Sequence, residues 1–427
     1  MHQEKTQSFI SFLSSSLTAY HAKDGLKAVL LENGFEKLLE TEDFSLKEGG
    51  KYFVERGAAL IAFTVGSLDH FSYKIVASHL DSPCLKLKAN PLQVKENAVT
   101  LNVETYGGGI WHTFFDRPLK IAGRVILSEN GALTQKTVVS PFTLTIPSMA
   151  IHLNRGVNDG FAINAQTDLA PLLSLRGNEQ DWLKKIAGES EVLSYDLFVV
   201  NADMPYVFGL NDEFLATPRA DDLASAYAST EALLAKADSD GICVMACLTH
   251  EEIGSNSAQG AAGDFLENVL RRIGYAFHFD DNEFYKALAS SFLLSVDNAH
   301  AVHPNHPEKS DPTNRVSLGG GIAIKSHAGG AYATDAMSEA VMKTVFERAG
   351  VAYQYFYNRS DMRSGSTMAI HAVTRLGVSA VDIGLPQLAM HSACECFALN
   401  DYDEMVNGLT AFFSSDILPT DDGIVLR

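Results

Sequence analysis

The chain has 427 residues, of which 46% are apolar and 20% charged, so it is too long for one ordinary core and predicts two domains. Its formal net charge is −19 and no run of Lys or Arg stands out, which argues against nucleic acid and membrane surfaces as partners and favours metal cations. The Cys residues are odd in number and lack a CxxC pair, as expected of reduced thiols in a cytoplasmic protein (Cys84, Cys243, Cys247, Cys394 and Cys396).

The chain opens with helical periodicity. Residues 3–35 predict one or two amphipathic helices, broken at 21–25 by HAKDG. No stretch there is apolar and long enough for an export signal or a membrane span, so we expect neither. Two β-prone runs follow at 58–66 and 73–79, and we expect them to form neighbouring strands.

The second of these runs ends on His79. Asp81 lies two residues further, hence on the same face of an extended chain, where it could hold the imidazole in its metal-binding tautomer. A hydrogen-bonded structural His is the alternative.

From about Cys84 to Tyr206 the pattern changes to short alternating runs separated by turns, which predicts a mostly β domain. These runs are 99–105, 119–127, 137–146 and 195–202. Because the α/β pattern resumes afterwards, we interpret residues 87–206 as an insertion into a domain made of residues 1–86 and 207–427. His152 lies in this insertion, where a buried or interface His is the simpler interpretation.

The α/β pattern returns at 217–237, where Pro218 and two Asp residues precede an amphipathic helix. Asp221 or Asp222 could cap this helix, or the pair could offer carboxylates at its N-terminus.

Two adjacent acids, Glu251 and Glu252, follow a buried strand predicted at 242–248. Open α/β sheets keep their ligands at such strand ends. Neighbouring side chains of an extended chain point apart, so one acid can bind a metal while the other faces the reacting water. The HExxH zinc motif is excluded, because its second His would fall on Gly254. A solvated acidic loop is the alternative interpretation.

A second apolar strand, within 291–297, ends on Asp297 in the same manner. The three His residues that follow, His300, His303 and His306, have helical spacing, but prolines interrupt it, so we expect loop residues rather than a metal triad.

The last third predicts a helix at 334–348 and a strand at 351–358. The turn at 364–367 then precedes a helix, where it could offer amides and hydroxyls to an anion or a carbonyl oxygen, or simply cap the helix. A strand-like run ends near His391, and a helix near 397–415 closes the chain.

The acids and imidazoles at these strand and helix ends form a set. One His and two carboxylates around each of two divalent ions, with one carboxylate shared, make a suitable hydrolytic site. Three carboxylates leave two dications with surplus positive charge, which activates a water and polarises a carbonyl. The set is His79, Asp221, Glu252, Asp297 and His391, with Glu251 beside it.

Seven blocks also occur in a familiar order: SHLDSPCLKLKAN, VETYGGGIWHTFFDRPLKIAGRV, AIHLNRG, ATPRADDLASAY, THEEIGSNSAQGA, SVDNAHAVHPNHPEK and MHSACE. In these blocks the chain resembles the bacterial branch of the aspartyl aminopeptidase family, essentially from end to end. The resemblance implies an α/β fold, in which a mixed-sheet dinuclear zinc exopeptidase domain is interrupted by a β-rich oligomerisation domain. It also implies two divalent ions per chain, zinc before cobalt or manganese, and dimers that assemble into a dodecamer.

The resemblance also implies roles for individual residues. His79 and Asp297 would hold one zinc, Glu252 and His391 the other, and Asp221 would bridge them. Glu251 would be the general base, with Asp81 supporting His79, and His152 would reach into the active site of the dimer partner. For substrate binding the resemblance implies Lys325, and the turn before the helix adds Ser366 and Thr367 as candidates.

The activity expected is metal-dependent removal of the N-terminal residue from short peptides, with a preference for acidic residues that Lys325 would favour. Two departures from the family pattern are Asp222, where many members have Asn, and SHAGGAYAT after Lys325, which bears on substrate preference. Alternatives are a carboxypeptidase or deacylase with the same metal pair, or a broad-specificity aminopeptidase. A glycosidase is excluded, because its paired acids must be about 5–10 Å apart.

Overall fold

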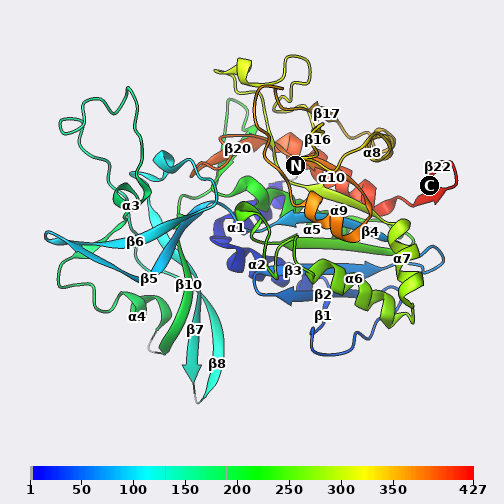
Figure 1. The fold of residues 1–427 in the computed structure, drawn as a ribbon, viewed down its shortest axis with the longest axis horizontal. Coiled ribbons are helices and arrows are strands. Elements are labelled where there is room, and N and C mark those ends of the chain that lie inside the picture. The colour runs from blue at the N-terminus through cyan, green and yellow to red at the C-terminus, as the bar shows by residue number, and fades with distance from the viewer. Residues whose placement is uncertain (1–2, 130, 189) are drawn as a thin grey trace.

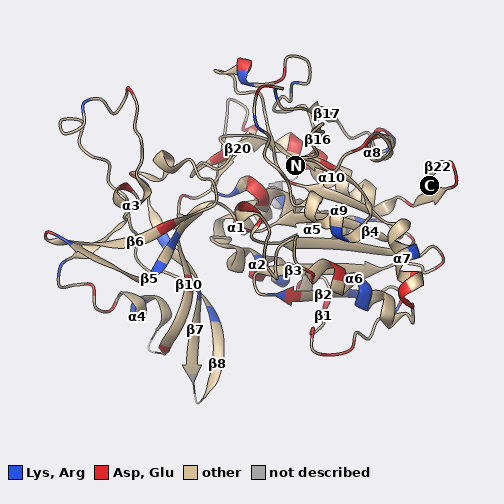
Figure 2. Ribbon diagram, in the orientation of Figure 1, with Lys and Arg blue, Asp and Glu red and all other residues tan. Residues whose placement is uncertain are grey.

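The computed structural model describes residues 3–129, 131–188 and 190–427 as two lobes, each built on its own β-sheet (Figure 1). The larger lobe is a mixed α/β structure around a nine-stranded sheet, and the smaller lobe is a six-stranded antiparallel sheet. Lys and Arg are interspersed with Asp and Glu over both lobes in this view (Figure 2). No helix in the described ranges is both long and apolar enough to span a bilayer.

The nine-stranded sheet of the larger lobe is mixed, and four neighbouring strands at its centre are parallel. In spatial order it contains β1 Glu36–Lys37, β2 Lys51–Arg56, β3 Ala59–Val65, β13 Ile242–Leu248, β4 Tyr73–His79, β14 Phe292–Val296, β18 Ser379–Gly384, β16 Ile322–Lys325 and β17 Tyr353–Phe356. Strands β4, β13, β14 and β18 run parallel to one another, so their carboxyl ends meet at one edge of the sheet.

Helices cover both faces of this sheet, which gives it two hydrophobic cores. Along β13, Cys243 and Met245 face one core while Val244 and Ala246 face the other, because successive strand side chains alternate. The first core contains α1 Gln3–Ser15, α2 Ala19–Glu32, α5 Ala220–Ala235, α8 Ala336–Ala349 and α10 Leu399–Ser414. The second contains α6 Phe265–Ala276, α7 Asp281–Ala289 and α9 Ala369–Leu376.

Two details at the N-terminus differ from the sequence-based expectation. The helix break lies between α1 and α2 at residues 16–18, not at 21–25. Gly25 lies within α2, and the Phe12 ring packs closely over it, since an added Cβ would lie 3.3 Å from that ring. The strands β3 and β4 are not neighbours either, since β13 lies between them, antiparallel to the first and parallel to the second.

The smaller lobe interrupts the larger one between β4 and α5. Its sheet contains β8 Ala132–Val139, β7 Leu119–Glu129, β10 Glu191–Asn201, β5 Cys84–Lys95, β6 Ala98–Tyr106 and β9 Leu172–Leu175 in spatial order, with η1 Trp111–Phe114, α3 Ala165–Asp168 and α4 Trp182–Ala187 around it. The strand expected over 137–146 ends at Val139, because Pro141 has no N–H for the ladder. Beyond it, Leu144, Thr145 and Ile146 form isolated bridges, with Leu119, Leu172 and Phe115 respectively.

A five-stranded sheet that sequence reasoning did not predict lies next to the larger one. It contains β11 Tyr206–Phe208, β12 Phe214–Thr217, β20 Glu395–Ala398, β19 Pro386–Leu388 and β15 Ala299–His300. The run expected to be one strand up to His391 is divided at Leu385 between β18 and β19, which belong to different sheets. The remaining short elements are η2 Glu251–Ile253, η3 Pro307–Lys309, β21 Ile417–Thr420 and β22 Gly423–Leu426.

Candidate metal centre

The carboxyl ends of β4 and β14 meet the start of α5 and bring together an imidazole and two carboxylates. Potential ligand atoms of His79, Asp221 and Asp297 all lie within 4.8 Å of one another, and all three residues are buried. Nε2 of His79 is 3.3 Å from Oδ1 of Asp221. Asp221 can leave the helix axis and reach this point because its backbone is not helical, although it opens α5.

The other oxygen of Asp221 faces a second pair of residues. Nε2 of His391 lies 3.6 Å from Oδ2 of Asp221 and 3.4 Å from Oε1 of Glu252. One carboxylate therefore presents one oxygen to His79 and the other to His391. Among the described residues, Oδ1 of Asp221 and Oε1 of Glu252 are buried and have no hydrogen-bond partner, which is unusual for carboxylate oxygens and common for metal ligands.

The centre concentrates negative charge in a buried place. Burial and the neighbouring Asp221 charge raise the pKa of Glu252 well above its usual range. Burial also raises the pKa of Asp297, although the Lys325 ammonium acts in the opposite direction. Burial likewise raises the pKa of Asp222, whose carboxylate accepts a hydrogen bond from the His79 backbone N–H at 3.2 Å. Carboxylates this crowded remain ionised only beside cations, and imidazole with carboxylate oxygen is a donor set that suits zinc.

Asp81 contacts His79 mainly through its backbone. Its carbonyl lies 3.0 Å from Nδ1 of His79, which orients the ring, whereas the nearer carboxylate oxygen is 3.7 Å from Nδ1. The carboxylate instead accepts hydrogen bonds from the backbone N–H groups of Glu251 and Glu252, each at 3.2 Å, and from the Tyr106 hydroxyl at 2.8 Å. Asp81 thus holds the loop that carries both acids.

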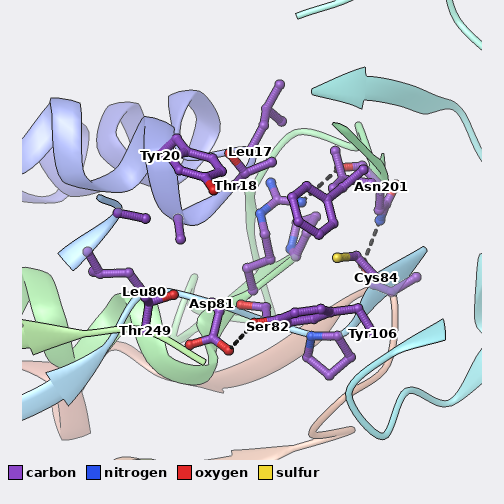
Figure 3. Close-up of a pocket in the computed structure, with 18 of the residues that line it drawn as sticks. Leu17, Thr18, Tyr20, Leu80, Asp81, Ser82, Cys84, Tyr106, Asn201 and Thr249 are labelled. Carbon is purple, nitrogen blue, oxygen red and sulfur yellow. Dashed lines mark hydrogen bonds between the residues drawn. The ribbon is translucent and has the colours of Figure 1, made fainter. Parts of the chain in front are cut away.

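A cavity between the two lobes is lined in part by Asp81. Figure 3 shows Tyr106 beside the Asp81 carboxylate, with Tyr20 of α2 and Leu17 of the segment before α2 across the cavity and Asn201 from the smaller lobe. Its empty volume is about 640 Å³. The Asp81 support is therefore built at the contact between the lobes.

Glu251 and Glu252 lie in the short helix η2 rather than on an extended chain. The prediction that the alternation of an extended chain points their side chains apart was therefore wrong, because the two acids are successive residues of a 3-10 turn. Glu252 makes the contact with His391 that is described above. Burial, with the charges of Asp297, Asp221 and Asp81, raises the pKa of Glu251 to about 8.

Two further buried charged residues, Lys325 and Glu395, contact the candidate ligands. Nζ of Lys325 donates to the backbone carbonyls of Asp297 at 2.7 Å and Asn298 at 3.2 Å, and lies 3.8 Å from the Asp297 carboxylate. Glu395 was not among the predicted site residues. Its carboxylate accepts hydrogen bonds from the backbone N–H groups of Asp221 and His391. Glu395 ends the MHSACE block, but a lone acid four residues after His391 does not by itself indicate this role.

The remaining predicted substrate-binding residues lie outside the ligand cluster. Thr367 is buried, and its hydroxyl donates to the Asp382 carboxylate at 2.6 Å, so it neither caps α9 nor faces open space. Ser366 is exposed in the segment before α9. His152 is exposed in the long loop that precedes α3, at the upper left of Figure 1, and belongs to the other lobe.

Comparisons with known proteins identify the family of this chain. The model of a family described as aminopeptidase I zinc metalloprotease (M18) matches residues 12–413. A protein of Clostridium acetobutylicum named probable M18 family aminopeptidase 2 is 41% identical over 428 residues, covering 96% of this chain and 99% of its own. A protein of Pseudomonas aeruginosa with the same name is 38% identical over 434 residues, covering 98% and 100%.

Solved structures show the same fold. A structure described as the Ape4 and Nbr1 complex superposes with a TM-score of 0.91 at 31% identity, covering 97% of this chain and 87% of its own. An M18 aminopeptidase from Thermotoga maritima gives a TM-score of 0.85 at 26% identity, covering 96% of both chains. A structure described as the mApe1 dodecamer of S. cerevisiae gives 0.84 at 25% identity, again covering 96% of both.

Proposed function

This chain belongs to the aminopeptidase I (M18) family of zinc metalloproteases, and we propose that it removes single N-terminal residues from short peptides at a two-metal site bridged by Asp221. The observation that carries the two-metal proposal is the orientation of Asp221, whose oxygens face His79 and His391 separately. In this proposal Asp297 completes the set around His79, and Glu252 completes the set around His391. Zinc fits best, with cobalt or manganese as substitutes.

Divalent ions in this place supply Lewis-acid chemistry, which activates a water and polarises the scissile carbonyl. We assign the proton transfers to Glu251. Its carboxylate takes a proton from the attacking water and returns it to the departing amine. Without cations, burial and the neighbouring carboxylates raise the pKa of Glu251 to about 8. Cations that neutralise those neighbours would lower this pKa and leave the carboxylate ionised, so that it can accept a proton at neutral pH. Asp81 keeps Glu251 in place through the backbone bond described above.

We propose that His152 serves the active site of a second copy of the chain. The support is its position: it is exposed on a projecting loop, between exposed apolar residues such as Ile151 and Leu153. Such a loop suits an interface between copies. There the imidazole would donate a hydrogen bond to the carbonyl oxygen as negative charge develops on it. The assembly we propose is a homo-oligomer of dimers, ultimately a dodecamer as in the S. cerevisiae relative, and we place it in the cytoplasm.

For the first residue of the substrate we propose an acidic preference that depends on Lys325. The Lys325 ammonium lies 3.8 Å from the carboxylate of Asp297, one of the candidate metal ligands. A broad-specificity aminopeptidase is the second candidate, and one observation favours it: two carbonyl oxygens and a carboxylate already surround the ammonium. Asp, Asn and Leu p-nitroanilides separate the two. Faster hydrolysis of the Asp compound that Lys325→Met abolishes supports the acidic preference, and equal rates exclude it.

One experiment tests the main proposal. The zinc-loaded enzyme is incubated with a tripeptide that has three different residues, and the products are identified over time. Release of the first residue, its loss with a chelator and its return with zinc are the expected results. Release of the last residue would indicate a carboxypeptidase, and cleavage of only an N-acylated peptide would indicate a deacylase.

A further inference from the structure

A second cavity adjoins the candidate metal centre, and its lining is basic. Its empty volume is about 960 Å³. Phe356 and Gln387 are buried at its base, whereas Lys309 and Arg363 are exposed at its rim. We call it the basic pocket and define it by His300, His303, Lys309, Phe356, Arg363 and Gln387.

The charge of the basic pocket is opposite to that of the chain. The whole chain carries −19, yet none of the pocket's lining residues is an acid, and they include Lys309, Arg359 and Arg363. Arg359 pairs with Asp361 at 2.7 Å. Lys309 and Arg363 have no ion pair with any residue in the described part of the chain, which leaves two cations able to pair with a ligand.

The base of the pocket adds an unused hydrogen-bond donor. Gln387 is 1% exposed, and its Oε1 accepts a hydrogen bond from Nδ2 of Asn298 at 2.9 Å. Its Nε2 has no partner among the described residues. A buried amide N–H₂ without an acceptor is costly, and it is commonly satisfied by water or by a ligand.

Two short segments connect the lining of the pocket to candidate ligands of the metal centre. Gln387 to Ala389 line it, and the candidate ligand His391 follows two residues later. On the other side Asn298, which bonds Gln387, directly follows Asp297. From this proximity we infer that a peptide bound at the centre extends into the pocket.

We propose that the basic pocket binds the C-terminal carboxylate of a short peptide, so that the enzyme prefers di- to tetrapeptides with a free C-terminus. This inference rests on the proposed aminopeptidase activity. The first residue must lie at the metal centre, and each further extended residue spans about 3.4 Å. The unpaired cations are at the exposed rim, beyond the buried base, where the far end of a short peptide arrives. Lys325, by contrast, is buried beside the ligands and already has acceptors.

The test compares peptides that differ only at the C-terminus. Leu-Gly-Gly and its C-terminal amide are hydrolysed by the zinc-loaded wild-type enzyme and by Lys309→Met, Arg363→Met and the double variant. We expect kcat/KM for the free acid to exceed that for the amide by about tenfold in the wild type, mainly through KM, with the ratio falling towards one in the double variant. Lys309→Glu should reverse the preference. Lys286→Met, an exposed lysine on α7, is the matched control and should keep the wild-type ratio.

Any of the following outcomes would overturn the inference. Equal rates on acid and amide in the wild type would exclude carboxylate capture, while hydrolysis of Leu p-nitroanilide in the same preparation would show that the aminopeptidase proposal stands. If the variants leave the acid-to-amide ratio unchanged but abolish a preference for Asp over Asn as first residue, the cations bind the first side chain instead. If no substrate loses its first residue, the proposed function itself fails.

Discussion

The carboxylate of Glu395 accepts a hydrogen bond from the backbone N–H of Asp221 at 2.9 Å. Its other oxygen accepts one from the backbone N–H of His391 at 2.6 Å, and the side chain is 2% exposed. Glu395 therefore fixes the separation of the proposed bridging ligand and one terminal ligand without facing the metals. Burial, with the nearby Asp221 charge, raises its pKa to about 8, although the backbone hydrogen bonds oppose that rise.

From this relationship we predict that Glu395→Gln weakens metal binding by about 10- to 100-fold, because the amide can accept only one of the two backbone bonds. Zinc titration against a competing chelator measures the effect. Asp401→Asn is the matched control, since Asp401 is a buried acid that also accepts two backbone N–H bonds, from Gly319 and Gly321. Equal loss of zinc affinity in both variants would show a general loss of packing instead.

The two adjacent acids should respond differently to the same substitution. Glu251→Gln should lower kcat by on the order of 10³-fold and leave the zinc content unchanged, because it removes a proton acceptor. Glu252→Gln should lose zinc, because it removes a ligand. Metal analysis beside steady-state kinetics separates the two, and the same zinc loss in both variants would mean that the roles are wrongly divided.

Removing the metals should destabilise the fold as well as stop the reaction. The buried carboxylates of Asp221, Glu252 and Asp297 would lose their counter-charge. A ligand present at about a thousand times its Kd stabilises a protein by about 4 kcal/mol. We therefore expect a chelator to lower Tm by several degrees at pH 7, and excess zinc to restore it. An unchanged Tm would argue against metals at this buried place.

His152 can be tested in mixed assemblies. His152→Ala should lower kcat about 10²- to 10³-fold without loss of zinc, because an oxyanion donor is removed. Co-expression with Glu251→Gln chains should then produce sites that combine an intact Glu251 with an intact His152 from another copy. Activity of the isolated heteromer above both parents is expected. A confirmed heteromer with no such gain would leave His152 as a structural residue.

Glu55 should make stability depend on pH in the acid range. It lies on β2 beside Lys23, Lys27 and Lys37, with separations of 3.0, 3.3 and 2.5 Å. Burial alone would raise its pKa, but hydrogen bonds from Lys37 and Lys23, with the charges of Lys23 and Lys27, lower the pKa from 4.5 to about 2. The folded state therefore favours the ionised form, and this stabilisation is present above pH 4.5 and disappears as the pH falls towards 2.

Accordingly, Glu55→Gln should reduce the free energy of unfolding by roughly 3 kcal/mol at pH 7. Denaturant unfolding of wild type and variant at several pH values measures this difference, which should shrink steadily below pH 4.5. Glu32→Gln, an exposed acid at the end of α2, is the control and should have little effect at any pH. A constant difference across the range would contradict the ion-pair explanation.

The sequence predicted the parts of the fold that are locally determined. β4 and β13 have the expected bounds because each is a mostly apolar run buried on both faces. Strand order was not predictable in the same way, since β13 is inserted between β3 and β4 by contacts across more than 160 residues. The five-stranded sheet was missed because strands such as β15, two residues long, carry no periodicity.

The candidate site was also predictable only in part. Its acids and imidazoles were found because they end apolar runs or open a helix, and the structure brings His79, Asp221 and Asp297 together. The surrounding interactions were not visible, because they use backbone groups. Glu395 binds two main-chain N–H groups, and Asp81 binds the η2 backbone, so neither bond depends on a recognisable pair of side-chain types.

The pairing of the inserted sheet also sets an order of events during synthesis. β5 and β10, where the chain enters and leaves the smaller lobe, pair with each other between Leu85 and Val199. This lobe can therefore close as soon as its own residues have emerged from the ribosome, because its strands need no later partner. The β2–β3 hairpin and β4 must wait for β13, which is made more than 160 residues after β4. Until then both present unpaired apolar edges, so the nascent larger lobe, rather than the insertion, is the part that needs protection from aggregation.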